Sequence, residues 1–456
     1  MAQRAPMVAL RREAPGAESS AGVKDPVAAY HELLEDERLA AASAELLAAG
    51  QRERSLMFGE RPLCVAIRPQ LMTRRRYERA VSAAEGVHSA LAALERAVLQ
   101  DEDLRRELGL EPEEERLALA DPGFTFSSPS VRLDSFFADE VRFVEYNAES
   151  PAGMAYSDNL AAIFTRLPVM KEFRKRFRGS FLPTRRRQLK AMLHAFKQWG
   201  KGARPVIAIV DWEGLPTAPE FEMFKSFFVA AGVKTVICDP RSLEMRRGRL
   251  YAQGSPVNLV YRRVLTSELL ARGDETRALR DAYVAGAICV VNSFRAKLLH
   301  KKMSLALLSD ERYKGLYTPA QRAAIRRHIP WTRKVRPELA EDIARRRETL
   351  VLKPNDEYGG KGVVLGWTVD QAEWEAAIGV ATTQSYVVQE AVEIPRVPFP
   401  VALDGLRYLD LAVDLDPYLF NGRVGGFMTR VSAAALLNVT AGAGSVVPTF
   451  VVEGPA

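Results

Sequence analysis

Short apolar runs rich in β-branched residues alternate with helix-like stretches between about residue 200 and residue 300. Four such runs are PVIAIV (205–210), KTVICD (234–239), VNLVYRR (257–263) and AICVVN (287–292). Strands of this kind, separated by helices, are typical of a parallel sheet covered by helices. The pattern therefore predicts a small α/β layer in this part of the chain.

The first hundred residues show a helical period instead. Apolar residues recur at helical spacing from residue 26 to about residue 50, where Gly50 is predicted to stop the helix. The same spacing at 72–108 predicts one or two further helices. Between them PLCVAI (62–67) has the composition of a strand, and EPEEER (111–116) indicates the start of a polar helix.

The last third of the chain is predicted to be rich in strands. TLVLKPNDEYGGKGVVLGW (349–367) has the pattern of a strand, a glycine-rich turn and a second strand, and SYVVQEAVEIP (385–395) that of a strand ending at its proline. Residues 406–432 are predicted to form a hairpin that turns at Asn421-Gly422, because Asn-Gly is the strongest short signal for a tight hairpin turn.

A further hairpin is predicted between residues 131 and 149, where VRLDSFF and VRFVEYNAE flank the short turn ADE. Alternation along a strand places Arg132 and Asp134 on one face of the first strand, and Glu145 and Asn147 on one face of the second. Two carboxylates and an amide oxygen suit a divalent cation without soft ligands. A nearby arginine can stabilise charge on a phosphoryl group or a tetrahedral intermediate. The alternative is an ordinary solvated hairpin.

The composition is that of a globular protein, with 47% hydrophobic and 27% charged residues among 456. Its length suggests two or three domains, and no apolar run approaches the roughly 20 residues that span a bilayer. The three cysteines lie far apart in apolar surroundings, without a CxxC pair, so we expect them to be reduced in a cytoplasmic protein. The five histidines have no zinc-site spacing.

The net charge is +7, with arginine clusters at 74–76, 185–187 and 345–347. Such an excess suits an anionic ligand, although arginine-rich helix faces are usually just solvated. No nucleic-acid-binding motif accompanies the charge, so nucleic acid is not expected as a partner. The oligomeric state does not follow from the sequence.

Lys353 ends an apolar strand, and a loop with Gly359, Gly360, Lys361 and Gly362 follows it. Glycines let backbone N–H groups approach phosphates, and a lysine supplies compact positive charge. The motif is not a P-loop, which opens a helix, and the motifs of protein kinases are absent. A glycine-rich hairpin with incidental lysines is the alternative.

The strand at 385–395 adds Gln389 and Glu390 at the end of an apolar run, followed by Val392. Such an edge suits an adenine and its ribose, although strands often end in polar residues. Near the C-terminus, Arg430 and Asn438 are placed to line a phosphate or substrate. A glycine-rich loop that closes the sheet is the alternative there.

Taken together, these motifs resemble the ATP-grasp superfamily, in which a strand lysine, a glycine-rich lid and a Gln/Glu hinge follow one another as Lys353, Gly359–Gly362 and Gln389–Glu390 do here. A second ATP lysine lies upstream in that superfamily. FRAKLLHKKMSLALL supplies Lys302, in a context similar to the LL-x-N-K helix of the glutathionylspermidine synthase group, with Lys301 in place of the asparagine. Lys297 is the alternative.

The hairpin at 131–149 is similar to the circularly permuted members, as in the synthetase domain of glutathionylspermidine synthase. These carry R-x-D and then E-Y-N-A-D ahead of the α/β layer, and here Arg132-x-Asp134 precedes EYNAE, so only the last acid, Glu149, differs. In the ordinary chain order the metal ligands follow the hinge, where this chain has Asp410, Asp414, Asp416 and Asn438. The permuted order implies instead that Asp134, Glu145 and Asn147 bind Mg²⁺ and that Arg132 contacts the transferring phosphate or developing oxyanion.

The resemblance implies an α/β fold of the circularly permuted ATP-grasp type, with a pre-ATP-grasp layer and N-terminal helices. The predicted divisions are a disordered tail (1–25), a mainly helical region (26–120), the metal-binding hairpin part of the core (121–200), the α/β layer (201–295) and the nucleotide-binding region (296–456).

The implied function is an ATP- and Mg²⁺-dependent ligase that joins a carboxylate to an amine through an acyl phosphate. Lys302, Lys353 and the glycine-rich loop are expected to hold ATP, and the substrates are expected to be small molecules or peptides. Two alternatives remain open. The chain could be an ATP-dependent phosphotransferase on the same fold, or a nucleotide-binding protein without catalytic activity.

Overall fold

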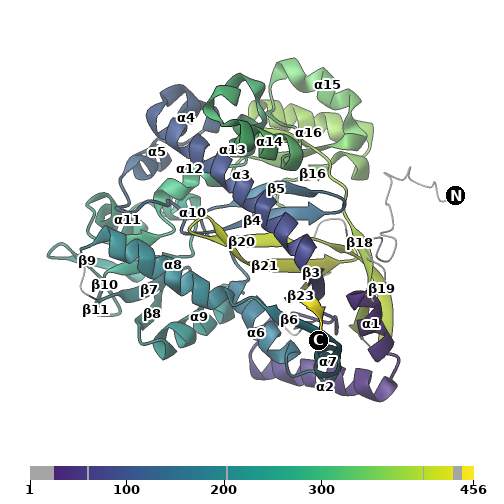
Figure 1. The fold of residues 1–456 in the computed structure, drawn as a ribbon. Coiled ribbons are helices and arrows are strands. Elements are labelled where there is room, and N and C mark those ends of the chain that lie inside the picture. Colours follow the sequence, from purple (N-terminus) through teal and green to yellow (C-terminus); the bar gives the residue numbers. More distant parts are fainter. Residues whose placement is uncertain (1–24, 59–60, 202–203, 404, 435–443) are drawn as a thin grey trace.

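The computed structural model describes residues 25–58, 61–201, 204–403, 405–434 and 444–456. The predicted disordered tail lies outside these residues except for Asp25, and Asn438 lies outside them as well. Within the described residues, the protein consists of a large antiparallel sheet, a parallel α/β layer and a smaller mixed helix–sheet unit, with helices over the sheet faces (Figure 1).

The large sheet is seven-stranded in the described part of the chain, in the order β18-β19-β21-β20-β4-β5, with β22 paired to β21. Helix α3 (Arg74–Gln100) lies across one face of it (Figure 1). The apolar stripe of α3, which includes Leu91 and Leu94, packs with Leu133 and Phe143 from the hairpin in one core. The strands are β4 (Ser130–Phe137), β5 (Val141–Asn147), β18 (Arg396–Ala402), β19 (Leu406–Val413), β20 (Asp416–Phe420), β21 (Arg423–Ser432) and β22 (Gly444–Val447).

Both predicted hairpins of this sheet are present. β4 and β5 pair antiparallel across the short ADE turn. β20 and β21 turn at Asn421 and Gly422, whose φ angles of 48° and 77° are those of the hairpin turn expected for Asn-Gly. The pairing of β20 with β4 then brings the C-terminal strands beside the hairpin at 131–149.

The predicted α/β layer is also confirmed. Its parallel strands lie in the order β13-β12-β7-β8, so the chain moves to one side of β7 and then to the other. A separate small antiparallel sheet, in the order β11-β10-β9, follows β8 in the chain. The elements are β7 (Val206–Val210), α9 (Ala218–Ala230), β8 (Lys234–Cys238), β9 (Glu244–Arg246), β10 (Arg249–Ala252), β11 (Ser255–Val257), β12 (Leu259–Arg262), α10 (Thr266–Ala271), α11 (Arg277–Val284) and β13 (Cys289–Val291).

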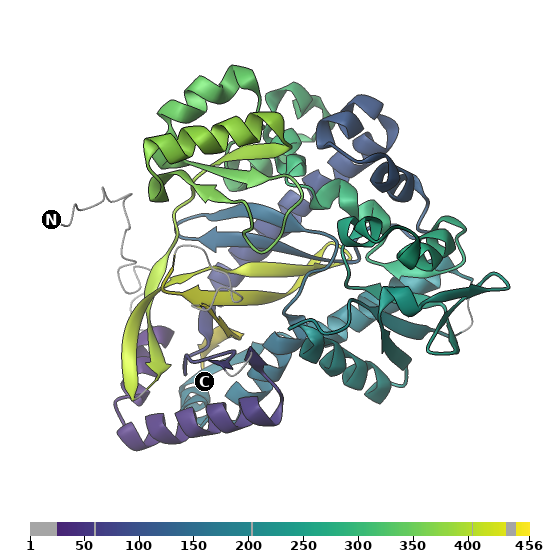
Figure 2. The same ribbon diagram turned by 180° about the vertical axis from the view of Figure 1, so that it is seen from behind.

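A third sheet, β14-β17-β15-β16, lies above the large sheet with the α/β layer to one side, as Figure 2 shows. β15 and β16 flank the glycine-rich loop, as predicted, whereas the strand predicted at 385–395 ends earlier, at Glu390. The elements of this region are α12 (Lys297–His300), α13 (Met303–Ser309), α14 (Pro319–His328), β14 (Thr332–Lys334), α15 (Ala340–Arg345), β15 (Leu350–Pro354), β16 (Val364–Leu365), α16 (Gln371–Thr383) and β17 (Tyr386–Glu390).

The helical N-terminal region differs from the prediction at Gly50. Two helices replace the single one, and Gly50 lies inside the second of them. A Cβ at Gly50 would come within 3.1–3.2 Å of Ile163, so this glycine allows close packing rather than ending the helix. The helices are α1 (Pro26–Leu33), α2 (Glu37–Glu53), α3, α4 (Glu102–Leu108) and α5 (Pro112–Leu119).

The strand predicted at 62–67 is wrong except at its first residue. Only β1 (Met57–Phe58) and β2 (Arg61–Pro62) form a short pair there. The backbone of Cys64 instead bonds to the buried side chain of Gln51, and Ala66 makes a single bridge to Val401. A side chain therefore takes the place of a neighbouring strand.

The last strand, β23 (Thr449–Pro455), lies between β3 (Gln70–Thr73) and β6 (Phe177–Phe181) in a three-stranded sheet. Helices α6 (Met154–Phe164), α7 (Pro168–Arg176) and α8 (Thr184–Trp199) complete this side. The three cysteines are free and buried. Among the described residues, no helix is long and apolar enough to cross a membrane.

Candidate functional site

The pairing of β4 and β5 brings the four predicted hairpin residues together on one face. Arg132 lies opposite Asn147, and Asp134 lies opposite Glu145. The register shifts just after Asp134, between it and Ser135, where the backbone N–H of Ser135 donates to Asp416 instead. The sequence prediction that these side chains share one face is therefore confirmed.

Asp134 accepts hydrogen bonds from three sides. Arg132 donates to its carboxylate at 2.7 and 3.2 Å, Asn147 donates through its amide at 2.7 Å, and Arg430 from β21 donates at 2.8 Å. Arg132 also donates to the carbonyl of Ala152 at 3.1 Å. Asp134 is thus the centre of the cluster, held by two guanidinium groups.

Arg430 draws two C-terminal carboxylates into the same cluster. Its guanidinium contacts Asp416 at 2.9 Å and also Asp414, and the backbone N–H of Arg430 donates to Asp414 at 2.6 Å. Asp410 is not part of the cluster, because it pairs with Arg396 on the exposed ribbon of β18 and β19. Asp414 and Asp416 occupy the region where the ordinary ATP-grasp order has its metal ligands. Here they lie in the same cluster as Asp134.

The carboxylates of this cluster titrate very differently. Burial alone would raise the pKa of Asp134, but Arg132 and Arg430 hold that pKa well below its usual range. Burial and the neighbouring charges of Asp134 and Asp414 raise the pKa of Asp416 well above its usual value. Burial also raises the pKa of Asp414, to about 6. Asp134 therefore stays ionised at neutral pH, whereas Asp416 holds its proton to higher pH than an ordinary aspartate does.

Lys302 lies beside Glu145. Its ammonium group is 3.1 Å from the Glu145 carboxylate and donates to the backbone carbonyl of Glu357 at 2.6 Å. Lys297, the alternative, is fully buried among the carboxylates of Glu149, Asp356 and Glu114 at 2.6–3.4 Å. Between the two lysines, Lys302 is the one that joins the hairpin cluster.

Lys353 points from β15 toward the hairpin. Its ammonium group donates to the carbonyl of Val144 at 3.1 Å and to the side chain of Gln389 at 2.7 Å. Thr332 accepts from the other end of Gln389 at 3.0 Å, which fixes the amide. Burial, reinforced by Lys302, lowers the pKa of Lys353 to about 8. An anion bound here would raise this pKa, because it favours the protonated form.

The glycine-rich loop between β15 and β16 is exposed at Gly359, Gly360, Lys361 and Gly362, and all three glycines have φ near +70°. Lys361 pairs with Glu357 at 3.1 Å within the loop and does not reach the cluster. The hydroxyl of Tyr358 is 3.1 Å from a carboxylate oxygen of Glu268 on α10. The loop thus extends from the sheet β14-β17-β15-β16 to the α/β layer.

The hinge residues are placed at the end of β17. The backbone N–H of Glu390 donates to the carbonyl of Trp331, and its carboxylate pairs with Arg346 at 3.0 Å. Val392 follows, half-buried. Glu390 is therefore held away from the lysines, whereas Gln389 touches Lys353.

The residues present fit a divalent metal ion. Among the described residues, no group of three or more His, Cys, Asp or Glu side chains is arranged to hold a metal ion. Mg²⁺, however, typically takes only one or two carboxylates and completes its shell with phosphate oxygens and water. Asp134 and Glu145 face each other across the hairpin with Asn147 beside them, which is that kind of donor set.

Residues 134–439 match the family described as circularly permuted ATP-grasp type 2. The chain belongs to this family. The match begins at Asp134 and includes Lys302, Lys353, Gln389 and Arg430. The predicted circularly permuted ATP-grasp fold is thereby confirmed.

Two solved structures extend the comparison of this family member. A glutathione synthetase-like effector from Globodera pallida, in the apo form, is similar with a TM-score of 0.56 at 13% identity, over 94% of this chain and 98% of that chain. A putative gamma-glutamylcysteine synthetase from Methylobacillus flagellatus has a TM-score of 0.41 at 12% identity, over 75% of this chain and 82% of that one. The first likeness shows a shared fold. No curated protein matches the chain.

Sequence reasoning missed the buried partners of the site. Glu149 was noted only as a departure from the family motif, yet it is fully buried and binds Arg262 at 2.9 Å and Lys297 at 3.3 Å. A buried acid could have been expected from YRR (261–263) at the end of a predicted buried strand, because a buried arginine needs an acidic partner. Thr332, which fixes Gln389, gave no signal.

Proposed function

We propose that the protein is an ATP- and Mg²⁺-dependent ligase that joins a carboxylate to an amine through an acyl phosphate. The observation that carries the proposal is the meeting of Asp134, Glu145 and Asn147 with Lys302 and Lys353, from three separate parts of an ATP-grasp chain. Carboxylates for a metal ion and lysines for phosphates then lie side by side, which is what transfer of a γ-phosphoryl group requires.

The hairpin residues and the lysines have different proposed roles. Asp134, Glu145 and Asn147 would hold Mg²⁺, which neutralises phosphate charge when bound. Lys302 and Lys353 would bind phosphate oxygens once ATP replaces their present partners, Glu145 and Gln389. Arg132, fixed by Asp134 and Ala152, would stabilise charge on the phosphoryl group or the tetrahedral intermediate. No side chain is required as a nucleophile.

The acceptor side of the site is proposed to lie at the carboxyl ends of β7 and β12. The strand order reverses between these two strands, and ligands of open α/β sheets bind at such a point. Arg263 follows β12 and donates to the carbonyl of Pro151 at 2.8 Å, one residue from the Ala152 carbonyl that Arg132 holds. This edge is therefore continuous with the phosphate end of the cluster.

The glycine-rich loop is proposed to act as a lid. It already spans from β15 to Glu268 of the α/β layer through Tyr358. Closure of such a loop over an acyl phosphate would exclude water and so protect the intermediate from hydrolysis. The exposed glycines supply the backbone freedom that the movement needs.

The proposal can be tested by a nucleotide-release screen with purified protein, Mg-ATP and pools of amino acids, peptides and amines. Free phosphate and product mass are read together. A ligase releases phosphate only when a carboxylate and an amine are both present, and the product mass equals their sum minus water. A phosphotransferase would keep the phosphate in a heavier product, and no turnover with any pool would favour a binding protein.

Site variants complete the test. Glu145→Gln removes one metal-binding charge while keeping the shape of the side chain, and Arg132→Lys keeps the charge but loses the paired contact with Asp134. Both are expected to lower turnover by at least about a hundredfold. Glu393→Gln, at an exposed position just after the hinge, serves as the control. Unchanged turnover in Glu145→Gln would refute the site.

A further inference from the structure

The buried ammonium group of Lys297 binds three carboxylates that come from three different elements. Asp356 lies at 2.6 Å, Glu149 at 3.3 Å and Glu114 at 3.4 Å, and the Lys297 side chain is 0% exposed. Glu149 follows the metal-binding hairpin, Asp356 opens the glycine-rich loop, and Glu114 belongs to α5. One side chain therefore connects the hairpin to the base of the loop.

The charges of this network balance. Lys301 contacts Glu114 at 2.8 Å and Asp356 at 3.8 Å, and Arg262 contacts Glu149 at 2.9 Å. The carboxylates counteract burial and raise the pKa of Lys297 above its ordinary value. Lys297 also helps to hold the pKa of Glu149 well below its usual range. Lys297 and Glu149 thus stay ionised at neutral pH.

Asp356 depends on Lys297 more than the other two acids do. Glu149 keeps Arg262 and the backbone N–H of Thr266 as partners, and Glu114 keeps Lys301. Among the described residues, the only other ion-pair partner of Asp356 is Lys301, at 3.8 Å. The loss of Lys297 would therefore release the loop before it releases the hairpin.

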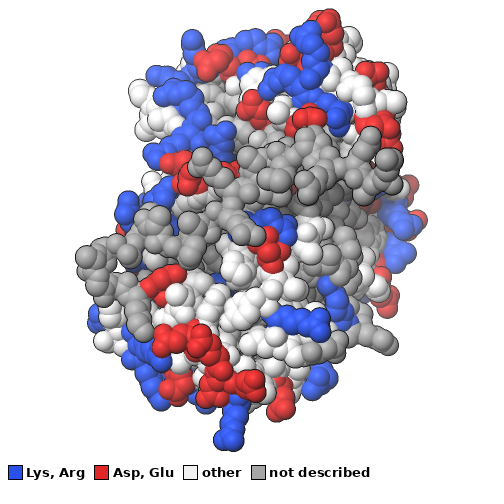
Figure 3. Space-filling model, turned by 90° about the vertical axis from the view of Figure 1, so that its right-hand side faces the viewer, with Lys and Arg blue, Asp and Glu red and all other residues white. Residues whose placement is uncertain are grey.

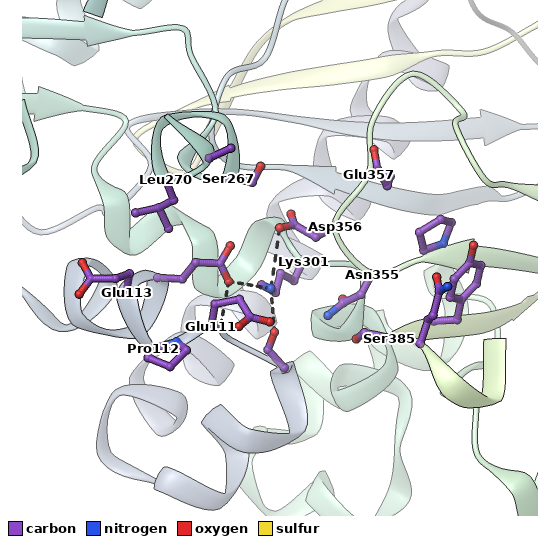
Figure 4. Close-up of a pocket in the computed structure, with 16 residues that line it drawn as sticks. Glu111, Pro112, Glu113, Ser267, Leu270, Lys301, Asn355, Asp356, Glu357 and Ser385 are labelled. Atoms are coloured by element: carbon purple, nitrogen blue, oxygen red, sulfur yellow. Dashed lines mark hydrogen bonds and ion pairs between the residues drawn. The ribbon is translucent and has the colours of Figure 1, made fainter. Parts of the chain in front are cut away.

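The side chain of Asp356 borders open space, whereas Asn355 beside it is buried and hydrogen-bonded to Leu108 and Met303. A cavity of about 680 Å³ borders the segment 354–357 and separates it from α10, as Figure 4 shows. Lys301 and Asp356 lie at the inner wall of this cavity, where dashed lines mark their ion pair. Without the tether, Asp356 has room to move into the cavity.

The position of Asp356 affects the surroundings of Lys302, one of the two lysines proposed to bind ATP. The next residue, Glu357, accepts a hydrogen bond from Lys302 through its backbone carbonyl at 2.6 Å. On the other side, Asn355 accepts from the backbone N–H of Lys302 at 2.9 Å. A shift at Asp356 would therefore change what Lys302 faces beside Glu145.

We propose that Lys297 is a positioning residue that anchors the glycine-rich loop at Asp356 against the metal-binding hairpin. It fixes the hinge from which the loop moves and keeps Lys302 directed at the site without touching the nucleotide. This proposal rests on the proposed function for the role of the loop as a lid. The tether itself can be tested without nucleotide.

The test compares Lys297→Met with Lys301→Met by hydrogen–deuterium exchange of the loop at 355–365. Both variants remove one buried ammonium from the same network, so they share its general destabilisation, but only Lys297 makes the close contact with Asp356. The Lys297→Met loop is expected to exchange at least about tenfold faster than in Lys301→Met. Lys297→Arg, which keeps the charge, is expected to restore part of the protection.

Asp356→Asn provides the second variant, because Asp356 is partly exposed and less costly to change. It is expected to speed loop exchange, and the double variant with Lys297→Met to exchange no faster than Lys297→Met alone. Equal loop exchange in Lys297→Met and Lys301→Met would overturn the proposal, as would additive effects in the double variant. If Lys297→Met fails to fold, Asp356→Asn against Lys301→Met gives the same decision.

The affinity for Mg-ATP separates this proposal from the proposed function. Lys297→Met is expected to bind Mg-ATP about tenfold more weakly than Lys301→Met does. Suppose that the loop exchanges faster in Lys297→Met than in Lys301→Met, but that the unaltered protein does not bind Mg-ATP. This result would support the tether and refute the function. Loop exchange in Lys297→Met that is no faster than in Lys301→Met, together with tight binding of Mg-ATP by the unaltered protein, would refute the tether and support the function.

Discussion

At the scale of single residues, Lys353 has an unusual titration within the site. Burial lowers its pKa to about 8, while a phosphate bound beside it would favour the protonated form. The affinity for Mg-ATP should therefore fall as the pH rises above about 8, because binding then requires uptake of a proton. The expected slope is up to about tenfold per pH unit, measured by titration calorimetry between pH 7 and pH 9.5.

Lys353→Arg is the matched variant, since arginine stays protonated throughout this range. Its affinity is expected to be weaker at pH 7, because the guanidinium cannot reproduce the contacts with Val144 and Gln389. The variant should nevertheless lose the fall above pH 8. A variant that kept the full pH dependence would assign the titration to another group.

The alternation of residues in the two strands was sufficient to predict that Arg132, Asp134, Glu145 and Asn147 share a face. For Arg430, the sequence predicted only a contact with phosphate or substrate. Its ion pair with Asp134 was not predictable, because this contact depends on which strand pairs with β4. The burial of Lys297 was not predictable either. Its three carboxylates lie far apart in the sequence, and no local pattern joins them.

At the scale of elements, Gly50 shows how packing can override a local signal. The helix continues past Gly50. A glycine is suited to this position because Ile163 of α6 packs so closely that an added Cβ would crowd it. The strand predicted at 62–67 failed for a similar reason, because Gln51 satisfies the backbone of Cys64. The parallel strands and the hairpins were predictable, since their patterns of apolar residues and turns are local.

Gly50→Ala should destabilise the protein by about 1 kcal/mol, because crowding against Ile163 outweighs the gain in helix propensity. Ile163→Ala alone should cost about 2–5 kcal/mol through the cavity it leaves. In the double variant the new methyl group occupies part of that cavity. Urea unfolding should therefore show a loss smaller than the sum, and strict additivity would contradict the close contact.

The glycine-rich loop offers a second test at this scale. Gly360 and Gly362 have similar φ angles of 78° and 70°, but a Cβ would meet nothing within 4 Å at Gly360 and would lie 2.7 Å from the Pro354 ring at Gly362. Gly362→Ala should therefore displace the loop and weaken Mg-ATP binding about tenfold more than Gly360→Ala does. Equal effects in calorimetry would mean that the loop conformation does not matter for binding.

At the scale of the whole molecule, the site exists because distant parts of the chain converge. β4 and β5 come early in the chain and β20 and β21 come late, yet these four strands belong to one sheet (Figures 1 and 2). β15 stands between them in sequence, and its Lys353 contacts Val144 of β5, while Arg430 of β21 contacts Asp134 of β4. The order of these parts is the permuted one, and the family match confirms it. The predicted domain boundaries stay a proposal.

The charged side chains of the molecular surface bear on the expectation that nucleic acid is not a partner, which stays a prediction. On the described part of the face drawn in Figure 3, basic side chains are interspersed with acidic ones. Most of the arginines of the predicted clusters that face solvent are paired, as Arg345 is with Glu341. We propose that the positive charge that binds the phosphates of ATP lies instead in the buried cluster, on Lys302, Lys353, Arg132 and Arg430.

The most direct test of the account is calorimetric titration of the protein with a non-hydrolysable ATP analogue, with and without Mg²⁺. We predict one binding site per chain that requires Mg²⁺, and at least about tenfold weaker binding in the presence of Mg²⁺ for Lys353→Met and for Glu145→Gln. Binding that is indifferent to Mg²⁺ and unchanged in both variants would contradict the assignment of the hairpin and Lys353 to one nucleotide site.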